Sequence, residues 1–235
     1  RDIPAAREQW ERARDIADQL PEDRPDVTAM RVAPRTLLVS TSLYVGNDAD
    51  TDRRYREFRI LATQTGDTRS LGIGMAGQLW AMSVNDQHVS EAAVLASELH
   101  DMAARADWDA ETLGIVVNAV AFVKFANCEF DAALRAIDLL SADQVPADEL
   151  APALALRGVI ELCLGRGVEG RRHLRDGIEL SRASTSLVVT HLVMYAGTVL
   201  ALGICESEEF LDDARDALRT AGAADESARP RRKFA

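Results

Sequence analysis

A pattern of small residues that recurs about every 40 positions constrains the fold of this chain more than any other feature. Each copy has a small residue, a larger one four positions later and a small or apolar one three positions after that, as in Ala133, Ile137 and Leu140. The successive copies begin at Ala6, Tyr55, Ala92, Ala133, Gly170 and Phe210, of which Tyr55 is placed mainly by its spacing. A period of this length is typical of solenoids built from helix hairpins, in which each hairpin buries its apolar face against the next.

The segments between turn signals predict helices throughout the chain, because they are rich in Ala, Leu, Arg, Glu and Asp and apolar at three- and four-residue spacing. The predicted helices span residues 4–20, 26–45, 51–65, 68–85, 89–106, 110–126, 129–141, 147–164, 168–182, 185–204 and 207–221. We expect Gly66 to end one helix, Asp67 to cap the next, and Pro34 to kink or split the helix that contains it. The predicted fold is all-α, a right-handed superhelix of hairpins with about eleven helices.

The domain organisation follows from the absence of any long linker. We expect one helical repeat domain over residues 1–222 and a flexible basic tail over residues 223–235. Residues 4–20 have the pattern of a second hairpin helix whose first helix is missing, and the chain does not begin with Met. This suggests a piece of a longer array, although an N-terminal capping helix would give the same pattern.

The charge of the chain argues against nucleic acid and membrane partners. It carries 27 Lys and Arg against 38 Asp and Glu, a formal net charge of −11, so it would repel polyanions. Residues 187–204 come nearest to a membrane span, but polar residues interrupt them, and a buried helix is the better interpretation. The odd number of cysteines, with no metal-binding or paired spacing, fits free thiols in a reducing cytoplasm.

No motif of nucleotide, metal or nucleophilic chemistry is visible, so we expect no catalytic residues, cofactor or metal. The chain has no phosphate-binding loop, and the glycines within residues 72–77 lie in a helical pattern with no strand before it. A remote alternative is a helical magnesium-dependent enzyme, because Asp212, Asp213 and Asp216 have the spacing by which prenyl-diphosphate enzymes hold Mg²⁺. An acidic first helical turn explains the same residues more simply.

A groove on the concave side of the predicted superhelix is the candidate binding site. Asn118, Phe122 and Phe125 lie on the predicted helix 110–126, and His191 and Tyr195 lie on the predicted helix 185–204. An apolar floor with a few polar groups suits a helix from a protein partner, another part of the same polypeptide, or a small molecule with an apolar body. Packing between helices, with a hydrogen-bonded Asn, is the alternative interpretation for each of these residues.

Four strings in the chain resemble a known family region. They are QLPEDRP at residues 19–25, GDTRSL at 66–71 leading into GQLW at 77–80, FANCEFDAAL at 125–134, and LGRGVEGRRHL at 164–174. This region is the degenerate tetratricopeptide-like part of large bacterial signalling ATPases, which are linked to adenylate or guanylate cyclase domains or are LuxR-type transcriptional regulators. The resemblance covers residues 5–222. It implies a non-catalytic interaction and sensing segment, with a freestanding small-molecule sensor as the alternative.

Overall fold

The computed structural model describes residues 3–24, 26–44, 49–83, 88–141 and 144–181. Every element in these ranges is helical, which confirms the all-α prediction. The last two predicted helices and the predicted tail lie outside the described residues. The chain divides into two compact units, Arg1–Glu129 and Phe130–Ala235, each with its own internal contacts.

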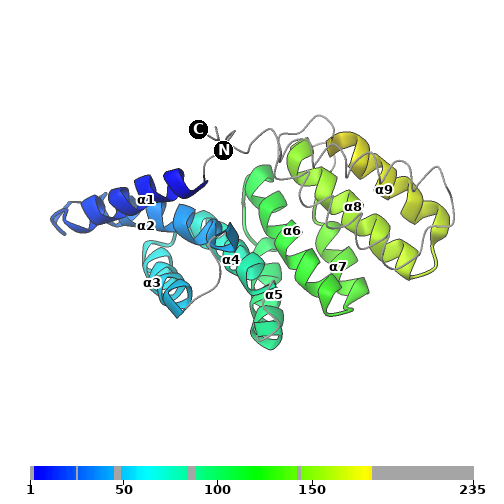
Figure 1. Ribbon diagram of the computed structural model, residues 1–235, viewed down its shortest axis with the longest axis horizontal. Helices are drawn as coiled ribbons and strands as arrows, with labels where there is room; N and C mark the ends of the chain where they lie inside the picture. Colours follow the sequence, from blue (N-terminus) through cyan, green and yellow to red (C-terminus); the bar gives the residue numbers. More distant parts are fainter. Residues whose placement is uncertain (1–2, 25, 45–48, 84–87, 142–143, 182–235) are drawn as a thin grey trace, which may run out of the picture. The chain divides into compact units, whose positions relative to one another are not determined.

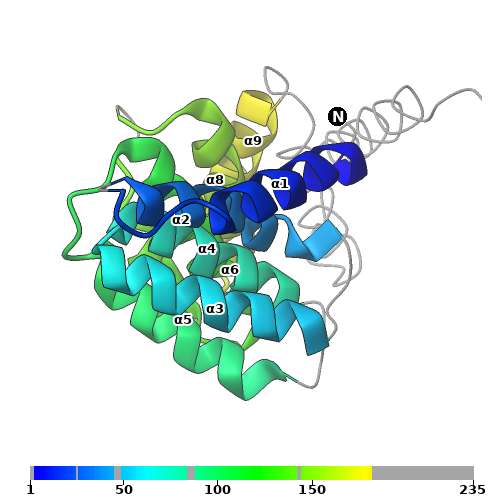
Figure 2. The same cartoon turned by 90° about the vertical axis from the view of Figure 1, so that its left-hand side faces the viewer.

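The first unit is built around one central helix, α4. Its elements are α1 (Ile3–Asp18), α2 (Val27–Ser40), the short 3-10 helix η1 (Ser42–Tyr44), α3 (Ala49–Thr65), α4 (Thr68–Ser83), α5 (Val89–Ala103) and α6 (Ala110–Ala126). Helix α4 contacts α2, α3, α5 and α6, and α1 packs on α2 (Figures 1 and 2). Phe58, Met75, Leu79 and Leu99 are among the fully buried side chains of this core. Burial of such apolar side chains supplies the main force that holds these helices together.

The glycines of α4 explain how so many neighbours reach one helix. A side chain at Gly74 would collide with the ring of Phe58 on α3, and one at Gly77 would collide with the backbone at Ser40, the end of α2. The run that fails as a nucleotide motif in the sequence is therefore a packing motif. Its small residues let α2 and α3 approach the backbone of α4 closely, and the core has no void there to fill.

Local signals set several helix boundaries as predicted. Gly66 has φ +67°, a backbone conformation that glycine adopts without a steric penalty, and it separates α3 from α4. The Asp67 carboxylate accepts a hydrogen bond from the Ser70 backbone N–H at 2.9 Å, which caps α4. Pro34, in contrast, does not split α2, which runs unbroken from Val27 to Ser40.

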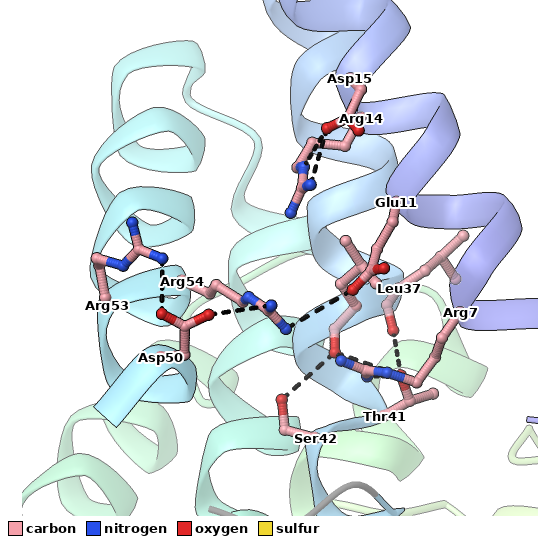
Figure 3. Close-up of polar contacts among 11 residues, drawn as sticks. Arg7, Glu11, Arg14, Asp15, Leu37, Thr41, Ser42, Asp50, Arg53 and Arg54 are labelled. Atoms are coloured by element: carbon pink, nitrogen blue, oxygen red, sulfur yellow. Dashed lines mark hydrogen bonds and ion pairs between the residues drawn. The ribbon is translucent and has the colours of Figure 1, made fainter. Parts of the chain in front are cut away.

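A cluster of arginines ties α1, α2 and α3 together (Figure 3). Arg7 of α1 is buried, and its guanidinium donates to the Leu38 carbonyl at 2.7 Å and to Thr41 Oγ1 at 2.6 Å, at the C-terminal end of α2. Arg54 of α3 forms ion pairs with Asp50 at 3.1 Å and with Glu11 of α1 at 3.8 Å. The positive guanidinium at the negative end of the α2 dipole is electrostatically favourable.

The second unit contains α7 (Phe130–Ile137), α8 (Ala147–Cys163) and α9 (Gly167–Ser181) among its described elements (Figure 1). Helix α7 ends earlier than the predicted range of 129–141. Helices α8 and α9 form a tight hairpin in which Gly158 faces Gly170. A Cβ atom at Gly158 would lie 2.6 Å from the Gly170 carbonyl oxygen, so only glycine allows this approach. The small-residue pattern read from the sequence marks the contact between these two backbones.

None of the helices described here combines the length and the apolar character that crossing a membrane requires.

Candidate functional site

Three of the five residues predicted to form the groove lie together on α6. Asn118 is buried, with 4% of its surface exposed, and Phe122 and Phe125 are half-buried. The ring of Phe122 packs against that of Trp80 on α4, with the ring centroids 4.9 Å apart and the planes inclined at 34°. Asn118 and Phe122 therefore contribute to the packing between helices of the first unit, and a binding role for them stays a prediction.

The remaining predicted residues cannot be placed with them. His191 and Tyr195, together with Asp212, Asp213 and Asp216 of the acidic motif, lie outside the described residues. In the described ranges, no three or more His, Cys, Asp or Glu side chains form a group that could hold a metal ion.

An open cavity of about 590 Å³ lies in the first unit, and we call it the α3–α4–α5 cavity. Its lining comes from three helices and the residue before α5: Asp52, Tyr55, Arg56, Arg59, Gln78, Met82, His88, Ser90, Glu91, Val94, Leu95 and Glu98. A volume of this size falls within the range of about 300–1,000 Å³ that is usual for small-molecule sites. The cavity is therefore large enough to hold a metabolite.

Helical spacing brings these side chains to a common space. On α3, Asp52, Arg56 and Arg59 recur at intervals of four and three residues, and on α5 Glu91, Leu95 and Glu98 do the same. Residues at such intervals share one face of a helix. These faces of α3 and α5 form two walls, on which Arg56, Glu91 and Val94 are exposed, and the buried Gln78 and Met82 of α4 add a third surface.

One ion pair links the two walls. Arg59 of α3 bonds to Glu98 of α5, so its charge is compensated within the cavity. Burial opposes the charged form of Arg59, but the hydrogen bond to Glu98 and the interactions with Tyr55 and the Glu98 charge together outweigh it, and the pKa of Arg59 is raised. Burial also raises the pKa of the neighbouring Tyr55 hydroxyl, although the Arg59 charge opposes this shift. Tyr55 is therefore a neutral hydroxyl at neutral pH.

A second polar group joins α3 to α4. The Gln78 side chain is 3% exposed, and its Nε2 donates to Asp52 Oδ1 at 3.2 Å. This bond fixes the orientation of the amide, because a flipped amide would set its oxygen against the carboxylate. Gln78 Oε1 is then a buried acceptor that receives no hydrogen bond from the described residues. Such a buried acceptor is costly unless a water or a ligand donates to it.

Arg56 adds a positive group to the same wall. Its Nε donates to the backbone carbonyl of Asp52 at 3.3 Å, and it forms no ion pair with any described residue. The cavity therefore combines apolar surface from Met82, Val94 and Leu95 with separate acceptor and donor groups. These groups can bind and orient a polar organic molecule, and the described lining contains no nucleophile paired with a base.

The sequence gives only a faint indication of this cavity. The polar side chains within 51–65 and 89–106 have the pattern expected for the solvent-exposed faces of two surface helices. Arg59 and Glu98 are 39 residues apart, close to the period of about 40 residues in the sequence, and the ion pair between them is seen only in the structure. The repeat pattern is weakest near Tyr55, so the sequence does not predict which residue of 89–106 lies opposite Arg59.

Comparison with known proteins assigns no family to this arrangement. No family model, no curated protein and no solved structure matches the chain. The function therefore has to be inferred from the helix packing and from the chemistry of the cavity.

Proposed function

We propose that the chain is a non-catalytic interaction and sensing segment of a bacterial signal-transduction or transcriptional regulator. Its fold in this proposal is a right-handed superhelix of tetratricopeptide-like hairpins. Binding of a protein partner, another part of the same polypeptide or a small-molecule effector is coupled to a tethered ATPase, nucleotide cyclase or DNA-binding module.

The observation that carries the proposal is the sequence separation of the contacts between successive hairpins. Arg59 pairs with Glu98 across 39 residues, and Arg69 donates to Asp109 across 40 residues, at 2.8 Å. Both separations match the period of about 40 residues in the sequence. Equivalent positions of neighbouring repeats meet in this way when hairpins stack with a constant stride.

The packing order in the first unit gives further support. Helices α2, α4 and α6 contact one another in succession, while α3 packs on α2 and α4, and α5 packs on α4 and α6. Each repeat thus contacts mainly its neighbours, as in quasi-one-dimensional arrays. A ligand that prefers one curvature of such a stack shifts the population of its conformations, and a tethered module that senses the curvature changes its activity.

Turnover by the purified chain is the first test. With Mg²⁺ and either ATP or GTP, we expect neither nucleotide hydrolysis nor cyclic nucleotide formation above a protein-free blank. Turnover that follows the protein through purification would contradict the proposal. If that turnover is lost in Asp213→Ala, the remote alternative of a magnesium enzyme built on Asp212, Asp213 and Asp216 takes its place.

A second experiment tests the coupling. The reading frame that surrounds this segment is expected to encode an ATPase, cyclase or DNA-binding module. Deleting residues 4–222 from that polypeptide should change the basal activity of the module. A frame without such a module would instead favour the freestanding sensor.

A freestanding small-molecule sensor is the second candidate, and the α3–α4–α5 cavity is the observation that favours it. A ligand at one hundred times its Kd stabilises the folded protein by about 2.7 kcal/mol, which a thermal shift assay detects. Screening a metabolite panel against the purified chain therefore tests this candidate without knowledge of the module.

A further inference from the structure

We infer that the α3–α4–α5 cavity binds a free amino acid with an apolar side chain, held as a zwitterion between Asp52 and Arg56. This inference rests on the proposed sensing function and names the class of effector. It follows from three features of the lining: a carboxylate and a guanidinium that do not pair with each other, a buried acceptor beside the carboxylate, and an apolar surface opposite them.

The first feature is an ion pair that the helix allows but does not form. Asp52 and Arg56 are four residues apart on α3, a spacing that normally favours pairing. Asp50 and Arg54, two residues earlier on the same helix with the same spacing, pair at 3.1 Å. Asp52 instead accepts from Gln78, and neither Asp52 nor Arg56 is in an ion pair with another described residue. A zwitterion supplies each of them with its missing opposite charge.

The second feature identifies the ammonium end of the ligand. Asp52 Oδ1 accepts from Gln78 Nε2, and the buried Oε1 of the same amide has no donor among the described residues. A carboxylate and an amide oxygen from two different helices suit an ammonium group, which has three N–H donors and no acceptor. The ligand's carboxylate is then left for the Arg56 guanidinium, whose fork of donors matches it.

The third feature identifies the side chain of the ligand. Met82, Val94 and Leu95 give the cavity an apolar part, and 70% of Val94 is exposed to water. An apolar ligand side chain covers this surface and is removed from water, at about 25 cal/mol per Å² of area buried. The other carboxylates of the lining have partners within the protein, since Glu98 pairs with Arg59 and Glu91 bonds to His88 Nδ1 at 3.0 Å.

Calorimetric titration of the full chain with L-leucine, L-methionine and L-phenylalanine tests the inference. We expect at least one of them to bind. For L-phenylalanine, two analogues separate the ends of the zwitterion: phenethylamine lacks the carboxylate, and 3-phenylpropanoate lacks the ammonium group. If L-phenylalanine binds, each analogue should bind at least about tenfold more weakly, because it leaves one charged side chain unpaired. For L-leucine, the corresponding amine and acid are isopentylamine and 4-methylpentanoate. For L-methionine, they are 3-methylthiopropylamine and 4-methylthiobutanoate.

Two pairs of variants locate the site. Asp52→Asn and Arg56→Gln should each weaken binding by about tenfold or more, since each removes one charge partner. Glu57→Gln and Arg53→Gln are the matched controls, with the same charge changes on the same helix outside the cavity lining, and they should bind like the wild-type chain. The analogue series uses only the wild-type chain and therefore does not depend on how the variants fold.

Three results would overturn the inference. The first is that none of the three amino acids binds at up to about 10 mM. The second is that the amino acid and its amine analogue bind with equal affinity. The third is that Asp52→Asn and Glu57→Gln bind the amino acid equally well. None of these results contradicts the proposed regulatory role. That role is contradicted by nucleotide turnover in the purified chain, or by a surrounding reading frame that encodes no ATPase, cyclase or DNA-binding module.

Discussion

At the scale of the single residue, Arg7 shows how a charged side chain can hold two helices together. Only 6% of it is exposed, and burial, with repulsion from Arg54, lowers the pKa of its guanidinium. Its hydrogen bonds from α1 to Leu38 and Thr41, at the end of α2, offset that cost. The sequence alone would place an arginine of a predicted surface helix in solvent.

We predict that Arg7→Ala lowers the free energy of unfolding by about 1–3 kcal/mol, because hydrogen bonds to a charged donor and buried packing are lost together. Denaturant unfolding of the purified chain measures the loss. Arg12→Ala is the matched control on the same helix, since its pair with Glu8 is more than 60% exposed on both sides, and it should cost less than about 1 kcal/mol. Equal losses in the two variants would contradict the structural role of Arg7.

Asp109 carries a prediction that depends on pH. It caps α6 by accepting from the Thr112 backbone N–H at 2.8 Å, and this bond, with help from the Thr112 hydroxyl and Arg69, lowers the pKa of Asp109. Because the pKa of Asp109 is lower in the folded protein than in the unfolded chain, the carboxylate stabilises the fold fully above the unfolded-state pKa of about 3.9. This stabilisation is lost as the pH falls through the folded-state pKa of Asp109. Asp109→Ala should cost about 0.5–2 kcal/mol at pH 7, and the difference from wild type should shrink below about pH 4.

Unfolding free energies of the two proteins across that pH range check this expectation. Asp109→Asn separates the cap from the charge, because Asn caps helices about as well as Asp. It should retain most of the stability at neutral pH and show a weaker dependence on acid. A difference between wild type and Asp109→Ala that grows as the pH falls would contradict the assignment.

At the level of the helices, the sequence predicts most of the described elements, and it errs where tertiary packing overrides a local signal. The range 110–126 is reproduced as α6, because Asp109 caps its start and its apolar residues continue to its end. The range 26–45 is divided into α2 and η1, and Pro34 is accommodated within α2. Its missing hydrogen bond and ring are tolerated because tertiary packing outweighs local preference.

The sequence predicts the candidate site less well than the helices. The sequence pattern assigns Asn118 and Phe122 to a concave groove, but Phe122 packs against Trp80 between two helices. The cavity residues Asp52 and Gln78 have no local signal of their own, since the contact between them spans 26 residues and two helices. Only the folded structure shows that they meet.

The hairpin of α8 and α9 gives a prediction about packing. Gly158→Ala places a methyl group 2.6 Å from the Gly170 carbonyl oxygen and the Leu174 nitrogen, both backbone atoms, so the helices must separate. Alanine is better than glycine in an isolated helix by about 1 kcal/mol, but overpacking costs about 1–3 kcal/mol. We expect a net loss of stability, measured by denaturant unfolding.

Gly167→Ala is the matched control on α9. The nearest neighbour of its added methyl group is the flexible Arg171 side chain at 3.5 Å, so this variant should be neutral or stabilising.

At the scale of the whole molecule, a constant stride makes a prediction about size. If hairpins continue to stack as they do between Arg59 and Glu98, each repeat adds to the length of the array and not to its width. A compact chain of 235 residues would have a radius of gyration of about 17–18 Å. We predict a clearly larger value by small-angle X-ray scattering, with a pair-distance distribution skewed to long distances. A chain that ends at residue 222 is the control, because the predicted basic tail would itself enlarge the radius. If the shortened chain scatters as a compact globule, the proposed superhelix is wrong. The inference about the α3–α4–α5 cavity would still stand, because it depends only on contacts within the first unit.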